Sequence, residues 1–211
     1  MRARHKKWAE PYLEAHKEII INNLDGLDSF LDCDNLYLEV GCGKGDFILG
    51  MSKKFPGNYI GIERDSNVAA MCCRKLVDDK IENVKLFYDD FDKVFEIIKD
   101  IKFNKVFLNF SDPWPKKKQH KRRLTSTSRL LQFATILKKN GLLVIKTDND
   151  MLYEDTLEYA ANVPYFEQIL NLPEYEFNED DDVMTEYEKN FRSQGKSIHK
   201  VIYKLKENAN V

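Results

Sequence analysis

Short apolar runs alternate with helix-like segments along most of the chain. The runs are rich in β-branched and aromatic residues, which is typical of buried strands. The segments between them place apolar residues three and four positions apart, as helices do. Strands are predicted at 36–40, 59–62, 84–88, 105–110, 142–146, 166–170 and 199–205. Helices are predicted at 12–23, 46–54, 66–79, 92–100, 124–138 and 150–161, with Asn140-Gly141 as the stop signal after the fifth of them.

This alternation predicts an α/β fold with a seven-stranded, mostly parallel sheet and helices on both faces. The last two predicted strands break the alternation, because residues 171–197 join them through a long acidic connection in place of a crossover helix. A connection of that length inside a compact domain is usually functional. We therefore expect the final strand to be antiparallel and to form by a hairpin-like return.

Length and composition favour one domain over residues 1–211, with a basic, helical N-terminal extension at 1–30 and an acidic insertion at 171–197. A hydrophobic content of 43% excludes a disordered chain. The net charge is only -2, but Lys and Arg cluster at 1–7 and 116–123. These two segments can bind a polyanion even though the whole chain is slightly acidic.

The cysteines and the apolar runs indicate a compartment. Cys33, Cys42, Cys72 and Cys73 contain no C-x-x-C spacing, which predicts free thiols in a reducing cytosol and no metal site. No apolar run approaches the ~20 residues of a membrane span. The first residues also lack the apolar core of a signal peptide. We expect a soluble cytoplasmic protein without a membrane partner.

The first predicted strand leads through Glu39 into a loop with Gly41, Gly43 and Gly45, and a helix follows. Glycines at alternate positions let the backbone turn sharply and approach a ligand closely. The spacing is G-x-G-x-G, whereas dinucleotide-binding folds use G-x-G-x-x-G. An acid just before the loop is unfavourable beside a phosphate and favourable beside a cation, so the loop predicts a cationic ligand without a pyrophosphate.

Further acids follow the next two strands at the same sheet edge. Glu63 ends the second strand, where a carboxylate can accept hydrogen bonds from both ribose hydroxyls. Asp89 and Asp90 follow the third strand and supply a third acid at this edge. S-adenosylmethionine fits this set, because it has an amino group, a ribose and a sulfonium but no phosphate. An ordinary glycine turn beside solvated acids would explain the loop alone, but not three acids at strand ends.

The segment 106–118 joins an apolar strand, Asp112, a tryptophan between two prolines and a run of lysines. An acid after a buried strand lies where open α/β sheets bind ligands. Trp114 can stack on a flat ring, and the cations after it can hold phosphates. A capped turn and a solvated loop would explain these features separately. Beside a methyl-donor pocket they favour RNA binding.

Five motifs occur in order across nearly the whole chain: LEVGCGKG (38–45), GIERD (61–65), FSDPWPKKKQHKRR (110–123), KTDN (146–149) and TEYE (185–188). With these motifs and its basic start at 2–8, the chain closely resembles the bacterial single-chain tRNA (guanine-N7)-methyltransferases. The combination of SDPWPK, the basic block and TEYE is specific to that family. The glycine loop alone marks only the wider class of methyltransferases.

The resemblance implies a Rossmann-like class I methyltransferase fold. It implies an enzyme that uses S-adenosylmethionine, releases S-adenosylhomocysteine and methylates a guanosine in the tRNA variable loop. The expected partner is tRNA; no obligatory protein partner is implied, and a homodimer is allowed. The acidic run 179–182 is expected to be a solvated, mobile loop.

The resemblance also implies a role for individual residues. Cofactor binding is expected at Glu39, Gly41, Gly43, Gly45, Glu63, Asp90 and Asp112, with Asp112 also catalytic. Substrate binding is expected at Lys116, Asp148, Thr185, Glu186, Tyr187 and Glu188. RNA contacts are expected at Lys118, Gln119, His120, Lys121, Arg122 and Arg123.

Three alternatives remain. A methyltransferase of another RNA base is one, although amino-methylating enzymes resemble an Asn/Asp-Pro-Pro-aromatic pattern and here tryptophan follows a single proline. A non-catalytic RNA-binding partner is the second, and the intact acids and glycines argue against it. A nicotinamide oxidoreductase is the third, and it is disfavoured by the glycine spacing and by the acid before the loop.

Overall fold

The computed structural model describes residues 6–209. The basic residues Arg2 and Arg4 lie outside the described part. The chain divides into two compact units: unit 1 comprises the residues up to Asp100 together with Glu179–Glu186, and unit 2 comprises Ile101–Asn178 and the residues from Tyr187 onward. That the whole chain acts as one domain stays a prediction.

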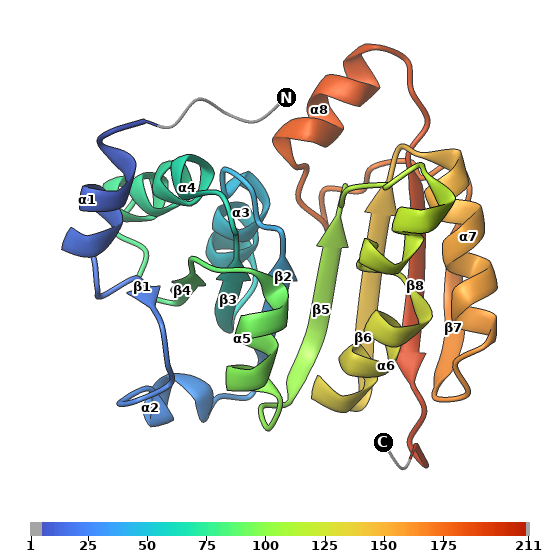
Figure 1. Cartoon of the computed structure of the whole chain (residues 1–211), viewed down its shortest axis with the longest axis horizontal. Helices are drawn as coiled ribbons and strands as arrows, with labels where there is room; N and C mark the ends of the chain where they lie inside the picture. Colours follow the sequence, from blue (N-terminus) through green and yellow to red (C-terminus); the bar gives the residue numbers. More distant parts are fainter. Residues whose placement is uncertain (1–5, 210–211) are drawn as a thin grey trace. The chain divides into compact units, whose positions relative to one another are not determined.

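Unit 1 has four parallel strands in the order β1-β4-β3-β2 (Figure 1). They are β1 (Ile20–Ile21), β2 (Leu36–Val40), β3 (Asn58–Ile62) and β4 (Val84–Phe87). Its helices are α1 (Ala9–Ala15), α2 (Asp28–Leu31), α3 (Asp46–Lys54), α4 (Ser66–Asp78) and α5 (Phe91–Ile98). Every residue of β2 is buried, so the strand carries the glycine loop on a rigid support.

The predicted helix at 12–23 is wrong. Helix α1 ends at Ala15, and Ile20 and Ile21 instead pair with Leu86 and Phe87 as strand β1. The β-branched run Ile19–Ile21 suits a strand better than a helix. The described residues therefore contain eight strands, one more than predicted.

Unit 2 has the strand order β5-β6-β8-β7. Its strands are β5 (Phe103–Asn109), β6 (Leu137–Thr147), β7 (Phe166–Leu172) and β8 (His199–Leu205). Strands β5 and β6 are parallel, whereas β8 is antiparallel to both β6 and β7, as the opposed arrows in Figure 1 show. The predicted antiparallel final strand is confirmed.

The other elements of unit 2 are the 3₁₀ helix η1 (Lys117–Arg122), α6 (Thr127–Ile136), α7 (Asp150–Ala161) and α8 (Glu186–Ser193), whose first residue belongs to unit 1. Asn140-Gly141 is not a helix stop, because β6 already begins at Leu137. Asn140 has φ +61° and the β5–β6 register shifts between Phe103 and Lys105, so the pair forms an irregularity within the strand.

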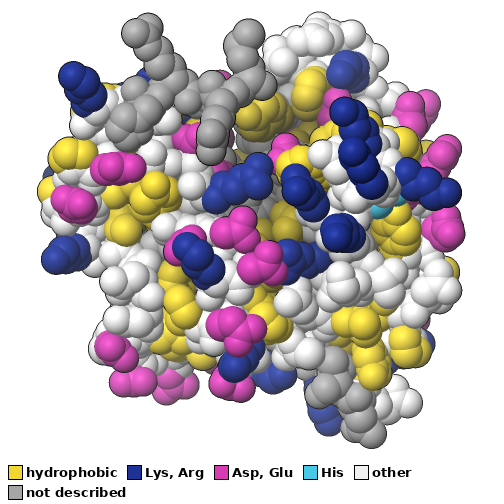
Figure 2. All heavy atoms as spheres, viewed as in Figure 1, with side chains coloured by type: hydrophobic (Ala, Val, Ile, Leu, Met, Phe, Trp, Pro, Cys, Tyr) yellow, Lys and Arg dark blue, Asp and Glu magenta, His cyan; other side chains and the backbone are white. Residues whose placement is uncertain are grey.

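Aliphatic and aromatic side chains from the strands and the facing helices form the core of each unit. Charged side chains of both signs lie across the visible surface (Figure 2). Within residues 6–209, no helix combines the length and the apolar character that crossing a bilayer requires.

Candidate functional site

The glycine loop of unit 1 has the backbone that its sequence predicts. Gly41, Gly43 and Gly45 have φ values of +80°, +58° and +84°. A Cβ on Gly45 would lie 2.3 Å from the Cys72 sulfur, whereas the space beside Gly41 and Gly43 is open. Gly45 therefore permits close packing of the loop on α4, and the other two leave the backbone accessible to a ligand.

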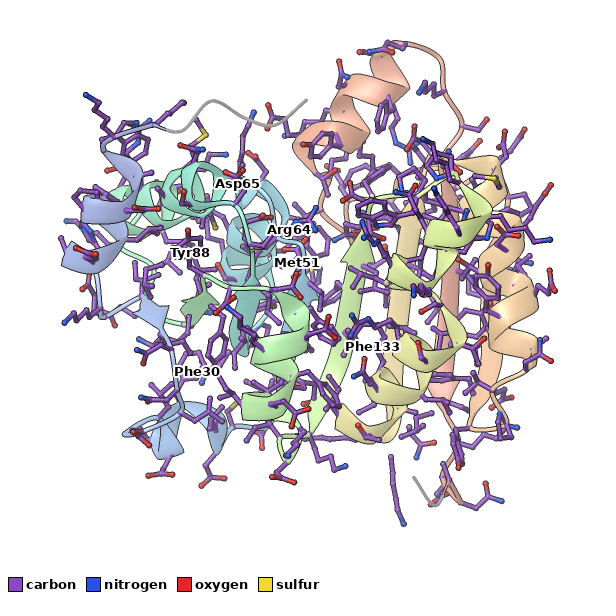
Figure 3. All side chains as sticks on the ribbon, viewed as in Figure 1. Phe30, Met51, Arg64, Asp65, Tyr88 and Phe133 are labelled. Atoms are coloured by element: carbon purple, nitrogen blue, oxygen red, sulfur yellow. The ribbon has the colours of Figure 1, made fainter. Side chains whose placement is uncertain are left out.

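Glu63 links this loop to the end of β3. Its carboxylate accepts hydrogen bonds from the backbone N–H groups of Gly43 (3.1 Å) and Asp65 (2.9 Å). Burial raises the pKa of Glu63 above its usual value, and these N–H groups oppose that rise. Arg64 and Asp65 mark this strand end in Figure 3. Glu39 is 3% exposed and lies opposite Gly61 in the β2–β3 register.

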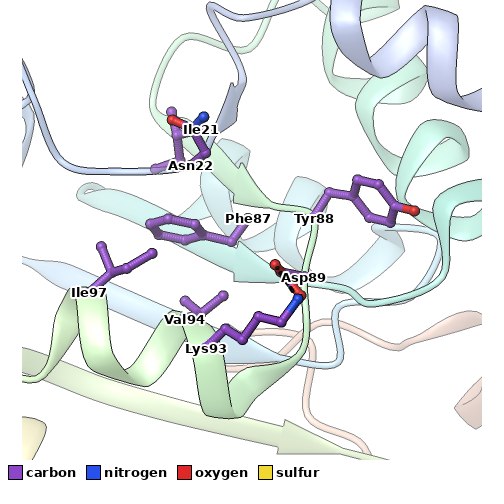
Figure 4. A pocket seen from close by; sticks show the side chains of 8 residues that line it. All are labelled: Ile21, Asn22, Phe87, Tyr88, Asp89, Lys93, Val94 and Ile97. Atoms are coloured by element: carbon purple, nitrogen blue, oxygen red, sulfur yellow. Dashed lines mark hydrogen bonds and ion pairs between the residues drawn. The ribbon is translucent and has the colours of Figure 1, made fainter.

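The two acids after β4 have different surroundings. Asp90 is the N-cap residue of α5, and its side chain accepts a hydrogen bond from the Asp92 N–H. Asp89 pairs with Lys93 at 2.9 Å, and this hydrogen bond holds the pKa of Asp89 below its usual value. Both residues of that pair line a small hollow of about 60 Å³ beside Phe87 (Figure 4). The assignment of the ligand contact to Asp90 stays a prediction.

The acidic run 179–182 is a loop whose first three residues are exposed, as its composition predicted, and only Asp182 at its end is buried. Asp182 is 5% exposed, and Val183 packs so closely on α3 that a Cβ added to Gly50 would lie 2.5 Å from its Cγ1. Thr185 is buried as well. Glu186 then reaches the glycine loop, where it forms an ion pair with Lys44 at 2.8 Å. Part of the TEYE motif thus lies beside the glycine loop within unit 1.

In unit 2, Asp112 follows β5 by three residues and is exposed. Arg123 stabilises the turn that carries Asp112, because its Nε donates to the Pro113 carbonyl at 2.7 Å. The same guanidinium pairs with Asp155 on α7 and lies 3.0 Å from His120 Nε2. Trp114 adopts a left-handed backbone (φ +40°), and Arg122 lies over its ring at 5.1 Å.

Arg123 is fully buried, so the structure gives no support to its predicted contact with RNA, which stays a prediction. Its charge is used inside unit 2 to fix the Asp112 turn. His120 also turns inward, with Nδ1 3.2 Å from the Tyr159 hydroxyl. Lys116, Lys117, Lys118 and Lys121 are exposed. Figure 2 shows a group of Lys and Arg side chains on unit 2, at the upper right of the view.

Glu188 is likewise buried, although a contact with substrate was predicted for it. It is fully buried and its carboxylate bonds Lys146 Nζ (2.8 Å) and the Arg192 guanidinium (2.8 Å). Arg192 also donates to the Tyr175 carbonyl at 2.9 Å. In this structure the oxygens of Glu188 anchor α8 to β6, and its contact with substrate stays a prediction.

Two other predicted substrate residues are accessible in unit 2. The Asp148 side chain follows β6, is 18% exposed and pairs with Lys196. Tyr187 is 56% exposed and stacks against Phe191 with ring centres 6.3 Å apart. Phe191 in turn lies 5.8 Å from Phe110. A row of aromatic rings, exposed at Tyr187 and half-buried at Phe191 and Phe110, therefore continues from the start of α8 to the residue that precedes Ser111.

The predicted cofactor residues gather in unit 1, except Asp112, which belongs with the exposed basic residues and Asp148 to unit 2. Sequence reasoning missed Lys44, Lys146, Phe191, Arg192 and Lys196. A lysine inside the apolar run LLVIK was a detectable signal for a buried ion pair. The described residues contain no group of three or more His, Cys, Asp or Glu side chains arranged for a metal ion.

Comparison with known proteins shows which proteins this chain is related to. Residues 34–201 match a family model described as "Putative methyltransferase". The tRNA (guanine-N(7)-)-methyltransferase of Limosilactobacillus reuteri is 40% identical over 98% of this chain and 100% of its own length. The enzyme of the same name from Bacillus subtilis is 37% identical over 95% of this chain and 97% of its own length.

Solved structures agree at the level of the fold. An rRNA methylase from Streptococcus thermophilus has a TM-score of 0.58 at 13% identity, over 88% of this chain and 98% of its own. A putative methyltransferase from Streptococcus mutans, solved in complex with SAH, also has a TM-score of 0.58 at 13% identity, over 89% of this chain and 99% of its own. Both chains show that the fold is that of methyltransferases.

Proposed function

The chain belongs to the tRNA (guanine-N(7)-)-methyltransferase family, and on that premise we propose that it methylates N7 of a guanosine in the variable loop of tRNA with S-adenosylmethionine. The full-length match at 40% identity carries this proposal. The open glycine loop supports it, because its backbone is accessible to a ligand. With tRNA as substrate, the enzyme is expected to act in the cytoplasm and to need no obligatory protein partner.

The residues of unit 1 fit S-adenosylmethionine. Gly41 and Gly43 have positive φ and open space in front of them, so a ligand can approach the backbone there. The Glu63 carboxylate would accept hydrogen bonds from the ribose hydroxyls. Glu39 is the acid suited to the ligand's positive charge, and Asp90 completes the proposed set. No phosphate-binding group is needed, in keeping with the G-x-G-x-G spacing.

The reaction needs alignment more than proton transfer. Bound S-adenosylmethionine would supply an electrophilic methyl group to the lone pair of guanine N7, which would leave a neutral thioether and a cationic base. N7 carries no proton, so no general base is required. Correct alignment can contribute ~7–11 kcal/mol. Asp112 and Asp148 would stabilise the charge that develops on the base.

The decisive test is incubation of the protein with unmodified tRNA and labelled S-adenosylmethionine, followed by borohydride reduction and aniline cleavage, which cuts at 7-methylguanosine. The proposal expects label in tRNA and one cut in the variable loop. Label without that cut would favour another RNA base. Absence of label together with intact tRNA binding would favour the non-catalytic RNA-binding alternative.

The pH dependence of cofactor affinity follows from Glu63. Its pKa is raised in the free protein by burial, so it gains its proton at a higher pH than an exposed glutamate. Because the folded protein binds this proton more tightly than the unfolded chain does, Glu63 contributes most to the free energy of unfolding below the pKa that it has in the unfolded chain. This contribution is lost as the pH rises through its pKa in the folded protein. Ribose hydroxyls need the ionised form as an acceptor, so affinity for S-adenosylhomocysteine should fall as pH drops through the raised pKa.

Isothermal titration calorimetry across that pH range measures this effect. Glu63→Gln should bind more weakly at neutral pH and lose the dependence, because its amide does not ionise. Glu82→Gln, at an exposed position of unit 1, serves as the control and should follow the unmodified protein. An unchanged profile in Glu63→Gln would remove Glu63 from the ribose contact.

The exposed lysines of η1 should bind tRNA phosphates. Replacing Lys117, Lys118 and Lys121 by Ala should lower tRNA affinity and reduce the slope of log affinity against log salt by roughly 0.7–0.9 per lost phosphate contact. Filter binding at several salt concentrations measures the slope. Affinity for S-adenosylhomocysteine should not change, and an equal loss of both affinities would contradict a separate RNA surface.

A further inference from the structure

Three side chains of unit 2 form a cation site near the ends of β6 and α8. Lys196 Nζ lies 3.1 Å from an oxygen of Asp148 and 4.5 Å from the centre of the Phe191 ring. A positive charge is thus held between a carboxylate and an aromatic face, the two groups that attract organic cations most strongly. The Lys196 side chain is 49% exposed, so it can leave the site without disturbing the core.

The end of α8 determines the position of Lys196. Gly195 has φ +72° and its N–H donates to the Arg192 carbonyl, while the Lys196 N–H donates to the Phe191 carbonyl at 3.1 Å. These two bonds form a Schellman motif, which brings the residue after the glycine back over the last turn of the helix. The lysine therefore covers the Phe191 ring because of how the helix ends.

The cation site lies next to the segment that carries Asp112. The Phe191 ring lies 5.8 Å from the Phe110 ring, and Phe110 precedes Asp112 by two residues. The Phe110 N–H donates to the Lys146 carbonyl at 2.8 Å, which holds this segment beside the end of β6. The cation site and the proposed catalytic acid thus share one rigid framework within unit 2.

We propose that Asp148 and Phe191 bind the guanine ring of the substrate, that they bind it more tightly once it is methylated, and that Lys196 occupies their site until tRNA arrives. The inference rests on the proposed function, because methylation at N7 converts a neutral ring into a flat cation. Guanine offers N1–H and amino donors to the carboxylate, and its ring stacks on Phe191. The positive charge gained on methylation takes the place of the lysine ammonium.

The test compares the binding of 7-methylguanosine 5′-monophosphate with that of guanosine 5′-monophosphate, at mildly acidic pH where the methylated ring is cationic. Lys196→Met removes the competing cation. It should raise affinity for both nucleotides by a similar factor of about 3- to 30-fold, the range of a cation–π contact, because the lysine must leave the site before either ring enters. Lys189→Met, exposed on the same helix, should change neither.

In the Lys196→Met background, Phe191→Leu and Asp148→Asn should each abolish the preference for the methylated nucleotide. Unchanged affinities for both nucleotides in Lys196→Met would overturn the inference, and so would a preference that survives both further substitutions. Failure of the proposed function shows separately, as the absence of an aniline cut in tRNA treated with the unmodified protein. A cut in tRNA together with unchanged nucleotide affinities in Lys196→Met would overturn only the cation site.

Discussion

Replacing Asp112 by Asn should reduce the single-turnover rate of methyl transfer to tRNA by about 10²–10³-fold, the usual cost of removing one group that stabilises developing charge. The amide keeps the shape of the side chain and removes its negative charge. The base gains a positive charge in the reaction, so the loss should be larger in the chemical step than in binding. Asp112→Ala should behave similarly and still bind tRNA.

Single-turnover kinetics with enzyme in excess is the right measurement, because it separates chemistry from product release. Ser111→Ala is the matched control, since it changes the neighbouring residue of the same turn without changing charge. Thermal unfolding should be the same for all three proteins, because Asp112 is exposed. An unchanged single-turnover rate in Asp112→Asn would place the reaction centre elsewhere.

The second large effect concerns the buried ion pair of unit 2. Glu188→Gln should lower the free energy of unfolding by about 3–5 kcal/mol, because it leaves the Lys146 ammonium buried beside a neutral amide. Both side chains are fully buried and their charged atoms are 2.8 Å apart, so water cannot replace the lost partner. Urea denaturation followed by circular dichroism measures the change.

A double variant separates the anchoring role from a substrate contact. Lys146→Met combined with Glu188→Met fills similar space without charge, and replacing a buried pair in this way is often neutral or stabilising. We expect the double variant to regain most of the lost stability and, with α8 back in place, most tRNA methylation. Restored stability without restored methylation would show that Glu188 also contacts substrate.

Arg192 also contributes to anchoring α8. Its guanidinium holds Glu188 and the Tyr175 carbonyl, and its charge lies over the Tyr175 ring at 5.4 Å. The Glu188–Arg192 spacing of four residues is visible in the sequence as a helical pair. The helix itself was not predicted, because residues 171–197 were expected to form a long acidic connection. Burial of Glu188 against Lys146 stabilises α8 in a way that no local pattern reveals.

The sequence by itself determined the elements whose signal is local. Strands β2 and β8 and helices α3 and α7 have the predicted bounds, because apolar spacing and glycine turns act over a few residues. The positive φ angles of the glycine loop, and the position of Glu63 beside this loop, also follow from local sequence. Family motifs located Asp112 and Asp148 for the same reason, since each lies within a short conspicuous segment.

Only the tertiary structure decided which charges face solvent. Arg123 and Asp155 are 32 residues apart in sequence, Lys146 and Glu188 are 42 apart, and Asp148 and Lys196 are 48 apart. A basic or acidic residue looks the same in sequence whether it is solvated or paired inside the protein. Its burial depends on a partner that folding brings from a distant segment. That is why the basic block and TEYE divide into residues that anchor the fold and residues that remain accessible to tRNA.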